Sequence, residues 1–198
     1  MTHDEVTGLI LAGGQGRRMG GRDKGLEPFG TARLIEHAKR CLEGRVAEVL
    51  INANRHLDEY QALGSRVIRD REGGYQGPLM GIWSGLEAAE TPWVVVVPCD
   101  SPALPNDLVE RLIAAIGEAD IAVAHDGEWD HPVVALIRRD LAADLGEALR
   151  EGERKIDRWY ARHAWVRADF SDCPAAFANL NTEDDKARLA QQLRADEA

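Results

Sequence analysis

The chain has 198 residues and a formal net charge of −10, with 24 Lys and Arg residues against 34 Asp and Glu residues. This length is sufficient for one well-filled core, so we expect a single domain over residues 1–198. Because an acidic surface repels nucleic acid and anionic lipid, the charge argues against nucleic-acid and membrane partners.

Apolar, β-rich runs alternate with helical patterns along the chain. We predict strands at Thr7–Leu11, Ala47–Ile51, Arg66–Ile68, Trp93–Val97, Asp120–Ala124, Val133–Ile137 and Ala164–Val166. The predicted helices are Ala32–Leu42, Leu57–Leu63, Leu79–Ala89, Pro105–Ile116, Leu141–Leu149, Arg154–Arg162 and Glu183–Leu193. Strands that are apolar without interruption are typical of a sheet covered by helices on both faces. The alternation therefore predicts an α/β fold with one doubly wound, mainly parallel, Rossmann-like sheet.

The first predicted strand leads into a segment rich in glycine and in cations. The glycines are Gly13, Gly14, Gly16, Gly20 and Gly21, and the cations are Arg17, Arg18, Arg22 and Lys24. The Walker pattern is excluded because Gly25, not Ser or Thr, follows Lys24, and the spacing of the glycines also fails the dinucleotide fingerprint. Backbone N–H groups of such a loop can point at anionic oxygens. The segment predicts a polyphosphate-binding loop, with a flexible surface loop as the alternative.

Polar residues follow several of the predicted strands. The second strand ends at Asn52–His56, the third at Asp70, and the fourth at Asp100. Ligands of such sheets lie beyond the carboxyl ends of the strands, so these side chains are candidates for one site. A carboxylate there suits Mg²⁺, which prefers one or two carboxylates together with substrate phosphates. The alternative for Asp100 is a cap of the turn that follows.

Four further groups of residues have sequence patterns that do not point to one specific role. Cys99 has no recognisable base partner, which favours packing over a nucleophilic role. We place Asp126, Asp130 and His131 in a loop after the fifth strand, which faces the substrate or forms a plain turn. Gly152, Arg154 and Lys155 indicate only a weak second anion site. Asn179 and Asn181 lie on one side of an extended segment, where they read the edge of a heterocycle or serve a turn.

The cysteines and the start of the chain bear on the compartment. Cys41, Cys99 and Cys173 are odd in number and form no Cys-x-x-Cys pair, which is typical of free thiols in a reducing cytoplasm. Residues 1–5 include no basic segment and precede no long apolar stretch, so we expect no signal peptide. We therefore expect a cytoplasmic protein.

With these residues in view, the chain resembles the molybdenum cofactor guanylyltransferases, the MobA-type nucleotidyltransferases. The motifs that carry the resemblance are Leu11–Gly14, Arg17–Gly21, Asp23–Gly25, Asn52–His56, Gly77–Leu79 with Gly81, Pro98–Asp100, Asp130–Pro132, Gly152–Arg154, and Asn179 with Asn181 and Thr182. The glycine loop with Arg and Lys is typical of nucleotidyltransferases in general. The segments Asn52–His56 and Asp130–Pro132 narrow the resemblance to this family.

The resemblance implies a nucleotidyltransferase fold, and an enzyme that transfers GMP from MgGTP to the phosphate of molybdopterin, releases pyrophosphate and forms the guanine dinucleotide. It implies nucleotide contacts for Leu11, Ala12, Gly13, Gly14, Lys24, Asn52, Asp70 and Asp100. It implies pterin contacts for Arg18, Gly21, Asn179 and Asn181. Lys24, Arg18 and Asp100 are the implied catalytic residues, and Asp100 the ligand of Mg²⁺ or, alternatively, Mn²⁺.

Other functions remain open beside this one. A CTP-using relative that acts on the same pterin differs only in a few loop contacts. A non-catalytic nucleotide- or pterin-binding carrier would retain the glycine loop, but mere binding does not need a metal carboxylate at the reacting phosphate. Transient contact with proteins that deliver or accept the cofactor is a further expectation.

Overall fold

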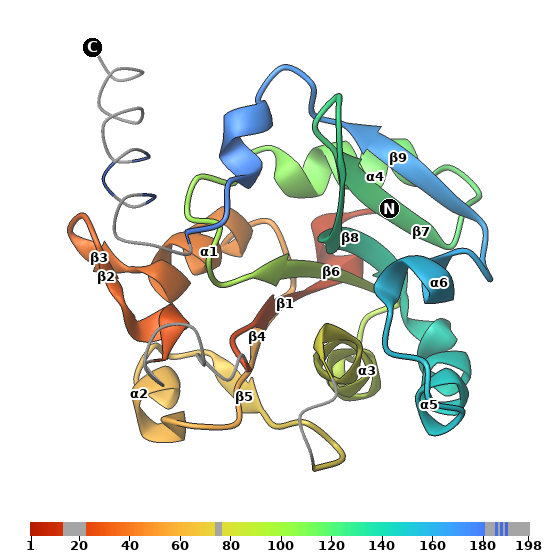
Figure 1. Ribbon diagram of the computed structural model, residues 1–198, viewed down its shortest axis with the longest axis horizontal. Coiled ribbons are helices and arrows are strands. Elements are labelled where there is room, and N and C mark those ends of the chain that lie inside the picture. Colours follow the sequence, from red (N-terminus) through yellow and green to blue (C-terminus); the bar gives the residue numbers. More distant parts are fainter. Residues whose placement is uncertain (14–22, 74–76, 181–184, 186, 188, 190–198) are drawn as a thin grey trace.

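A seven-stranded sheet runs through the centre of the molecule (Figure 1). The computed structural model describes residues 1–13, 23–73 and 77–180, and residues 185, 187 and 189. The strands of the sheet are β1 (Val6–Leu11), β4 (Glu48–Asn52), β5 (Arg66–Ile68), β6 (Trp93–Pro98), β7 (Ile121–His125), β8 (Asp130–Arg138) and β9 (Trp165–Asp169). Their spatial order is β5-β4-β1-β6-β8-β7-β9. Strand β8 runs antiparallel to both of its neighbours, and the other neighbouring pairs are parallel.

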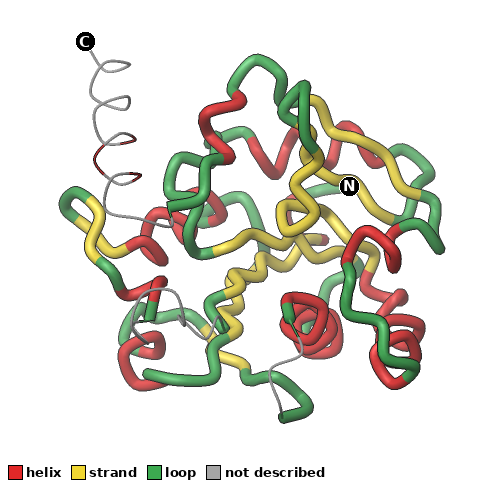
Figure 2. The backbone as a smooth tube through the Cα atoms, viewed as in Figure 1, coloured by secondary structure: helices red, strands yellow, loops and turns green. Residues whose placement is uncertain are grey.

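Helices cover both faces of this sheet, as Figures 1 and 2 show. They are α1 (Leu34–Leu42), α2 (Leu57–Gln61), α3 (Pro78–Ala88), α4 (Leu108–Ile116), α5 (Ala142–Arg150) and α6 (Ile156–Tyr160). One apolar cluster joins α1, α2 and α4 to one face, and a second joins α3, α5 and α6 to the other. The predicted doubly wound, mainly parallel α/β fold is confirmed. Among the described residues, no helix is long and apolar enough to cross a membrane.

Strand β6 explains why the central strands are apolar along their whole length. Its four consecutive valines, 94 to 97, are fully buried. Because successive side chains of a strand point to opposite faces, Val94 and Val96 enter one cluster while Val95 and Val97 enter the other. Each fully buried valine contributes roughly 1.5 kcal/mol of transfer free energy to folding. The strand is thus fixed between two cores, and the residues after it emerge at a defined point of the sheet edge.

Two sequence-based predictions are corrected by the strand pairing. Residues 32 and 33, expected as the first turn of a helix, form β3 (Ala32–Arg33) and pair with β2 (Pro28–Phe29). Gly30 supplies the positive φ, 61°, that this short hairpin needs. The helix begins only at Leu34, where the Glu36 carboxylate accepts a hydrogen bond from the backbone N–H of Arg33.

The second correction concerns Asp130 and His131, which were expected in a loop. They lie in β8, opposite His125 and Ala124 of β7. Aspartate and proline are poor strand formers, so the local sequence around Asp130 and Pro132 favours a loop. The hydrogen-bonded ladder with β7 overrides that preference. Only residues 126 to 129 connect the two strands.

The parallel strands deliver their carboxyl ends to one edge of the sheet. Strands β1, β4, β5 and β6 are neighbours in the order β5-β4-β1-β6 and run in one direction. Strand β7 has the same direction as β6, because β8 is antiparallel to both. Residues that follow these strands therefore meet at the edge where ligands of such folds bind.

Candidate active site

Lys24 and Asp100 form an ion pair at the carboxyl edge of the sheet. Lys24 opens a short 3-10 turn, η3 (Lys24–Leu26), and Asp100 lies two residues beyond β6. The Lys24 Nζ and the Asp100 Oδ2 are 2.5 Å apart, and the two side chains are 22% and 20% exposed. The backbone N–H of Leu180 donates to the Asp100 carbonyl at 3.0 Å and holds the loop in place. A cation and a carboxylate that are 76 positions apart in the sequence are thus brought into contact beside solvent.

Asn52, Asn54 and Asp70 form a second polar group at this edge. Asn52, the last residue of β4, is 2% exposed, and its Nδ2 donates to Asp70 Oδ1 at 3.0 Å. The Nδ2 of Asn54 donates to the other carboxylate oxygen at 2.8 Å. The Asn54 Oδ1 in turn accepts from the backbone N–H of Asp70 at 3.0 Å. Both oxygens of Asp70 therefore accept hydrogen bonds from amides, one at the end of the neighbouring strand β4 and one just beyond it.

Two glycines allow the backbone to approach these amides closely. A Cβ atom at Gly13 would lie 3.2 Å from both Asn52 Oδ1 and Asn54 Nδ2. At Gly81, in the first turns of α3, a Cβ would lie 2.6 Å from Asn52 Oδ1 and 2.9 Å from Leu11 Cδ2. The backbone N–H of Ala12 donates to the Asn52 carbonyl at 2.8 Å, which continues the pairing of β1 with β4. The end of β1, with Leu11, Ala12 and Gly13, is therefore in register with Asn52.

Asn179 reaches the same edge from the C-terminal part of the chain. Its Oδ1 accepts a hydrogen bond from the buried Ser101 hydroxyl at 2.8 Å. Because Ser101 follows Asp100, this bond brings an amide next to the Lys24–Asp100 pair. Four predicted site residues lie outside the described part of the chain: Gly14, Arg18, Gly21 and Asn181.

The β7–β8 hairpin contains two His–Asp pairs. His131 Nε2 lies 2.7 Å from Asp126 Oδ2, and its ring stacks on Phe177 with centroids 4.6 Å apart. His125 Nδ1 lies 2.9 Å from Asp130 Oδ1, which also accepts from Arg167. In the described part of the chain, no group of three or more His, Cys, Asp or Glu side chains could hold a metal ion. The histidines and aspartates of the hairpin are thus hydrogen-bonded to each other, and whether the hairpin faces the substrate stays a prediction.

Asp126 makes the stability of this hairpin depend on pH. The backbone N–H of Trp129, the His131 ring and the Glu128 N–H together lower the pKa of Asp126 from 3.8 to about 2. Since the folded-state pKa lies below its ordinary value, the stabilisation is fully present at neutral pH and disappears as the pH falls through about 2. We expect Asp126→Asn to lower the Tm by roughly 2–4 °C at pH 7, the loss of about one hydrogen bond to a charged group.

Thermal unfolding measured from pH 7 to pH 2 checks this expectation. The difference in Tm between the wild type and Asp126→Asn should shrink as the pH falls below about 4. Asp157→Asn, an exposed carboxylate on α6, is the matched control and should change the Tm little at either pH. A difference for Asp126→Asn that stays constant over the whole range would contradict the assignment.

Two other residues that the sequence analysis singled out, Cys99 and Arg154, make contacts within the fold. Cys99 is buried in the apolar cluster of α1 and α4, and burial, followed by the charges of Asp100 and Asp23, raises the pKa of its thiol well above the usual range. Its packing is as expected. The Arg154 guanidinium donates to the Leu149 carbonyl at 2.8 Å and so satisfies the end of α5.

Sequence reasoning missed some residues that support this edge. Gly81 was noted only within a family motif, since a glycine inside a helix has no unambiguous local meaning. Tyr60 and Asp23 contact each other through a buried hydrogen bond. A tyrosine in a predicted helix is expected to pack in the core. Nothing in the spacing of Tyr60 indicates that its hydroxyl binds Asp23, which is 37 positions away. Asn54 carried a signal, because it alternates with Asn52 after the same strand.

Comparison with known proteins gives one consistent relationship. Residues 8–167 match the family model of the MobA-like NTP transferase domain. The chain is 45% identical to the molybdenum cofactor guanylyltransferase of Shewanella halifaxensis over 96% of both chains, and 44% identical to that of Shewanella pealeana over 98% of both. A solved structure, molybdopterin-guanine dinucleotide biosynthesis protein A from Archaeoglobus fulgidus, has the same fold with a TM-score of 0.76. That match has 23% identity and covers 96% of this chain and 99% of the other.

Proposed function

Because this chain belongs to the MobA-like NTP transferase domain family, we propose that it transfers GMP from GTP to the phosphate of molybdopterin, forming the guanine dinucleotide and releasing pyrophosphate. The observation that carries the proposal is the Lys24–Asp100 pair at the sheet edge, in a chain whose relatives at about 45% identity are named for this transfer. A cation and a metal-type carboxylate in contact are what a phosphate-transfer site needs and a simple binding site does not.

A divalent metal, Mg²⁺ or alternatively Mn²⁺, fits the chemistry of Asp100. Its carboxylate contacts the Lys24 ammonium through Oδ2, and the side chain is 20% exposed, so a cation that arrives with the substrate phosphates can reach it. A single carboxylate completed by substrate phosphates is the coordination that Mg²⁺ prefers. When bound there, such an ion would neutralise phosphate charge at the reacting phosphorus.

The remaining site residues divide between the two substrates. We assign Leu11, Ala12, Gly13, Gly14, Asn52, Asp70 and Lys24 to the nucleotide. Two observations support this assignment: the pairing of β1 with β4, and the amides that donate hydrogen bonds to the Asp70 carboxylate. We assign Arg18, Gly21, Asn179 and Asn181 to the pterin, and the Ser101–Asn179 bond supports this for Asn179.

The reaction then follows from charge and position. An oxygen of the molybdopterin phosphate forms a bond to the α-phosphorus, while the bond from that phosphorus to the bridging oxygen breaks and pyrophosphate leaves with the electron pair. The attacking phosphate is already ionised at neutral pH, because its second pKa is near ~6, so no strong general base is needed. Lys24, with Arg18 of the glycine loop, stabilises the negative charge that grows on the leaving oxygens. The protein thus acts by holding two polyanions together.

The direct test is product formation. The 198-residue chain is incubated with molybdopterin, Mg²⁺ and one of GTP, CTP or ATP, and the dinucleotide is separated and identified. We expect the guanine dinucleotide and pyrophosphate in equal amounts with GTP. Product formed preferentially with CTP would give the function of a CTP-using relative. Nucleotide binding without product from any nucleotide would indicate a carrier.

Nucleotide preference should also appear in thermal stability. A ligand at 100 times its Kd stabilises the folded state by about 2.7 kcal/mol, which corresponds to a rise in Tm of roughly 5–10 °C for a chain of this size. We therefore expect GTP with Mg²⁺ to raise the Tm more than CTP or ATP at equal concentration. The measurement is differential scanning fluorimetry, with each nucleotide also tested after chelation of the metal. An equal or larger rise with CTP contradicts the guanylyl assignment.

A further inference from the structure

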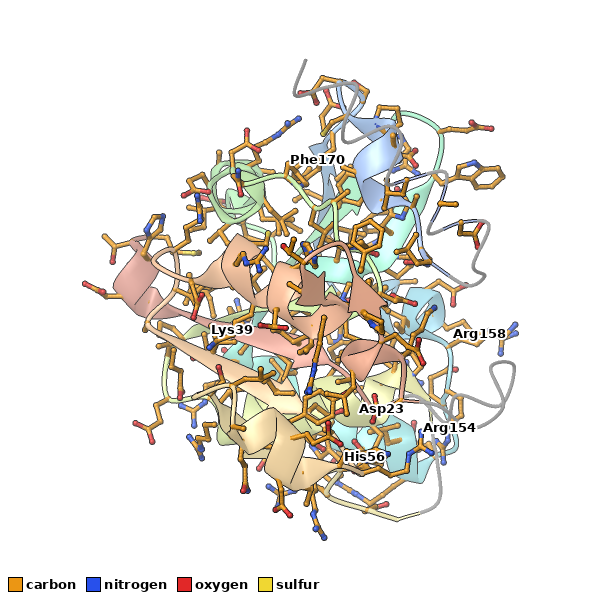
Figure 3. All side chains as sticks on the ribbon, turned by 90° about the vertical axis from the view of Figure 1, so that its left-hand side faces the viewer. Asp23, Lys39, His56, Arg154, Arg158 and Phe170 are labelled. Carbon is orange, nitrogen blue, oxygen red and sulfur yellow. The ribbon has the colours of Figure 1, made fainter. Side chains whose placement is uncertain are left out.

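A buried tyrosine of α2 contacts the segment that carries Lys24. Tyr60 is fully buried, and its phenol O–H donates to Asp23 Oδ1 at 2.5 Å. Asp23 is only 9% exposed and directly precedes Lys24 in the chain. Asp23 is labelled in Figure 3, together with His56, the residue that precedes α2. The bond therefore connects α2 to the residue next to the candidate catalytic lysine.

The same phenol also fixes the residue on the other side of Lys24. A Cβ atom at Gly25 would lie 2.5 Å from the Tyr60 hydroxyl oxygen, so glycine at this position leaves room for the hydroxyl group. Hydrogen bonds from Leu26 N–H to the Asp23 carbonyl and from Glu27 N–H to the Lys24 carbonyl, both 3.2 Å, close the turn η3. Tyr60 thus contacts both neighbours of Lys24 in a turn whose backbone is already hydrogen-bonded.

We propose that Tyr60 is a positioning residue: through Asp23 and Gly25 it fixes the turn from which Lys24 reaches Asp100, and so sets where the ammonium group meets the nucleotide polyphosphate. This inference rests on the proposed function. Tyr60 has no access to solvent, so its role is exerted through Lys24 and not by contact with substrate.

The physical reason is the cost of a buried carboxylate without its donor. Burial, and then the hydrogen bond with Asp23, raises the pKa of the Tyr60 phenol far above its usual range, so the phenol remains a neutral donor. Without the hydroxyl, one Asp23 oxygen would lose this donor in a nearly closed environment. The turn can relieve that cost by moving toward solvent, and Lys24 would move with it.

The test is a double-mutant cycle on the 198-residue chain. Tyr60→Phe keeps the ring and removes only the hydroxyl. The nucleotide Kd is measured by calorimetry with GTP and Mg²⁺. We expect Tyr60→Phe to raise this Kd roughly tenfold in the wild-type background. In the Lys24→Ala background the same change should have no further effect, because the residue it positions is gone. Equal effects in both backgrounds overturn the proposal, since the hydroxyl then acts on binding without Lys24.

Tyr160→Phe is the matched control. Tyr160 is also a buried tyrosine whose hydroxyl donates a hydrogen bond, at 2.8 Å to the Pro132 carbonyl, but it belongs to the apolar cluster of α5 and α6. We expect it to lower the Tm about as much as Tyr60→Phe while leaving the nucleotide Kd unchanged. A similar rise in Kd for both variants would show a general loss of stability and would also overturn the proposal.

A second measurement does not depend on nucleotide binding. Competitive labelling with acetic anhydride, followed by mass spectrometry, reports how freely the Lys24 amine reacts relative to the exposed Lys155. We expect Lys24 to react severalfold faster in Tyr60→Phe and to be unchanged in Tyr160→Phe. Unchanged labelling in Tyr60→Phe overturns the positioning role. A wild-type protein that binds no nucleoside triphosphate contradicts the proposed function instead, while the labelling still decides the role of Tyr60.

Discussion

Asp100→Asn is expected to abolish nucleotidyl transfer while the protein stays folded. The change keeps the shape of the side chain and removes the charge that faces Lys24 and that would hold the metal. Loss of a metal carboxylate together with the electrostatic partner of a catalytic lysine should lower kcat/KM by on the order of 10³-fold or more. The two side chains are 22% and 20% exposed, and the asparagine oxygen can still accept from Lys24, so the change should cost roughly 1–3 kcal/mol and leave the protein folded. Pyrophosphate release with GTP, Mg²⁺ and molybdopterin gives the rate, and thermal unfolding gives the stability.

Asp107→Asn is the appropriate control for that measurement. Asp107 is an exposed carboxylate on the same connection between β6 and α4, 3.8 Å from Arg111. It undergoes the same chemical change at a position whose side chain is 60% exposed and faces Arg111, so turnover should stay within about twofold of the wild type. If Asp100→Asn also kept its turnover within tenfold, Asp100 would have no role at the metal.

Asn52→Asp is expected to destabilise the protein strongly at neutral pH. The new carboxylate would be nearly fully buried beside Asp70, at the 3.0 Å separation now spanned by a hydrogen bond. Two carboxylates so close cannot both ionise without cost, so the folded-state pKa of the pair rises above its ordinary value. The cost is therefore largest above that raised pKa and disappears as the pH falls below about 4. We expect a loss of roughly 2–4 kcal/mol at pH 7, a fall in Tm of about 5–15 °C.

Asn54→Asp separates the effect of burial from that of charge. Asn54 donates to the same carboxylate at 2.8 Å but is exposed to solvent. Water and salt screen the new repulsion there, so we expect a loss of about 1 kcal/mol or less. Tm values at pH 5 and pH 7 for both variants check this order. Equal losses for the two would mean that Asn52 is not in a low-dielectric environment.

The sequence predicted the parallel half of the sheet well because long apolar strands have few alternative structures. β5 was predicted at its observed bounds, and β6 to within one residue. The hairpin of β2 and β3 was missed because two residues per strand give no period, and the start of β8 was missed because its residues favour loops. These elements exist through tertiary pairing, which a local pattern does not contain.

The candidate site divides in the same way. Asp100, Asp70 and Asn52 were identified because each follows a strand, and the topology of a parallel sheet brings strand ends together. The contact of Lys24 with Asp100 could be expected only in outline, since 76 positions separate the two residues. The support of Lys24 by Tyr60 depends on how a short helix packs under a turn, and no spacing in the sequence records it.

The insertion of β8 between β6 and β7 has a consequence for synthesis on the ribosome. The four parallel strands β1, β4, β5 and β6 are complete once residue 98 has been made, but the free side of β6 is paired only by residues 135–138. Until those residues leave the exit tunnel, the nascent chain presents a valine-rich strand edge with unpaired backbone groups, which is a template for pairing between chains. The order of strands in this sheet thus makes the middle of translation the stage at which a chaperone would protect the protein most.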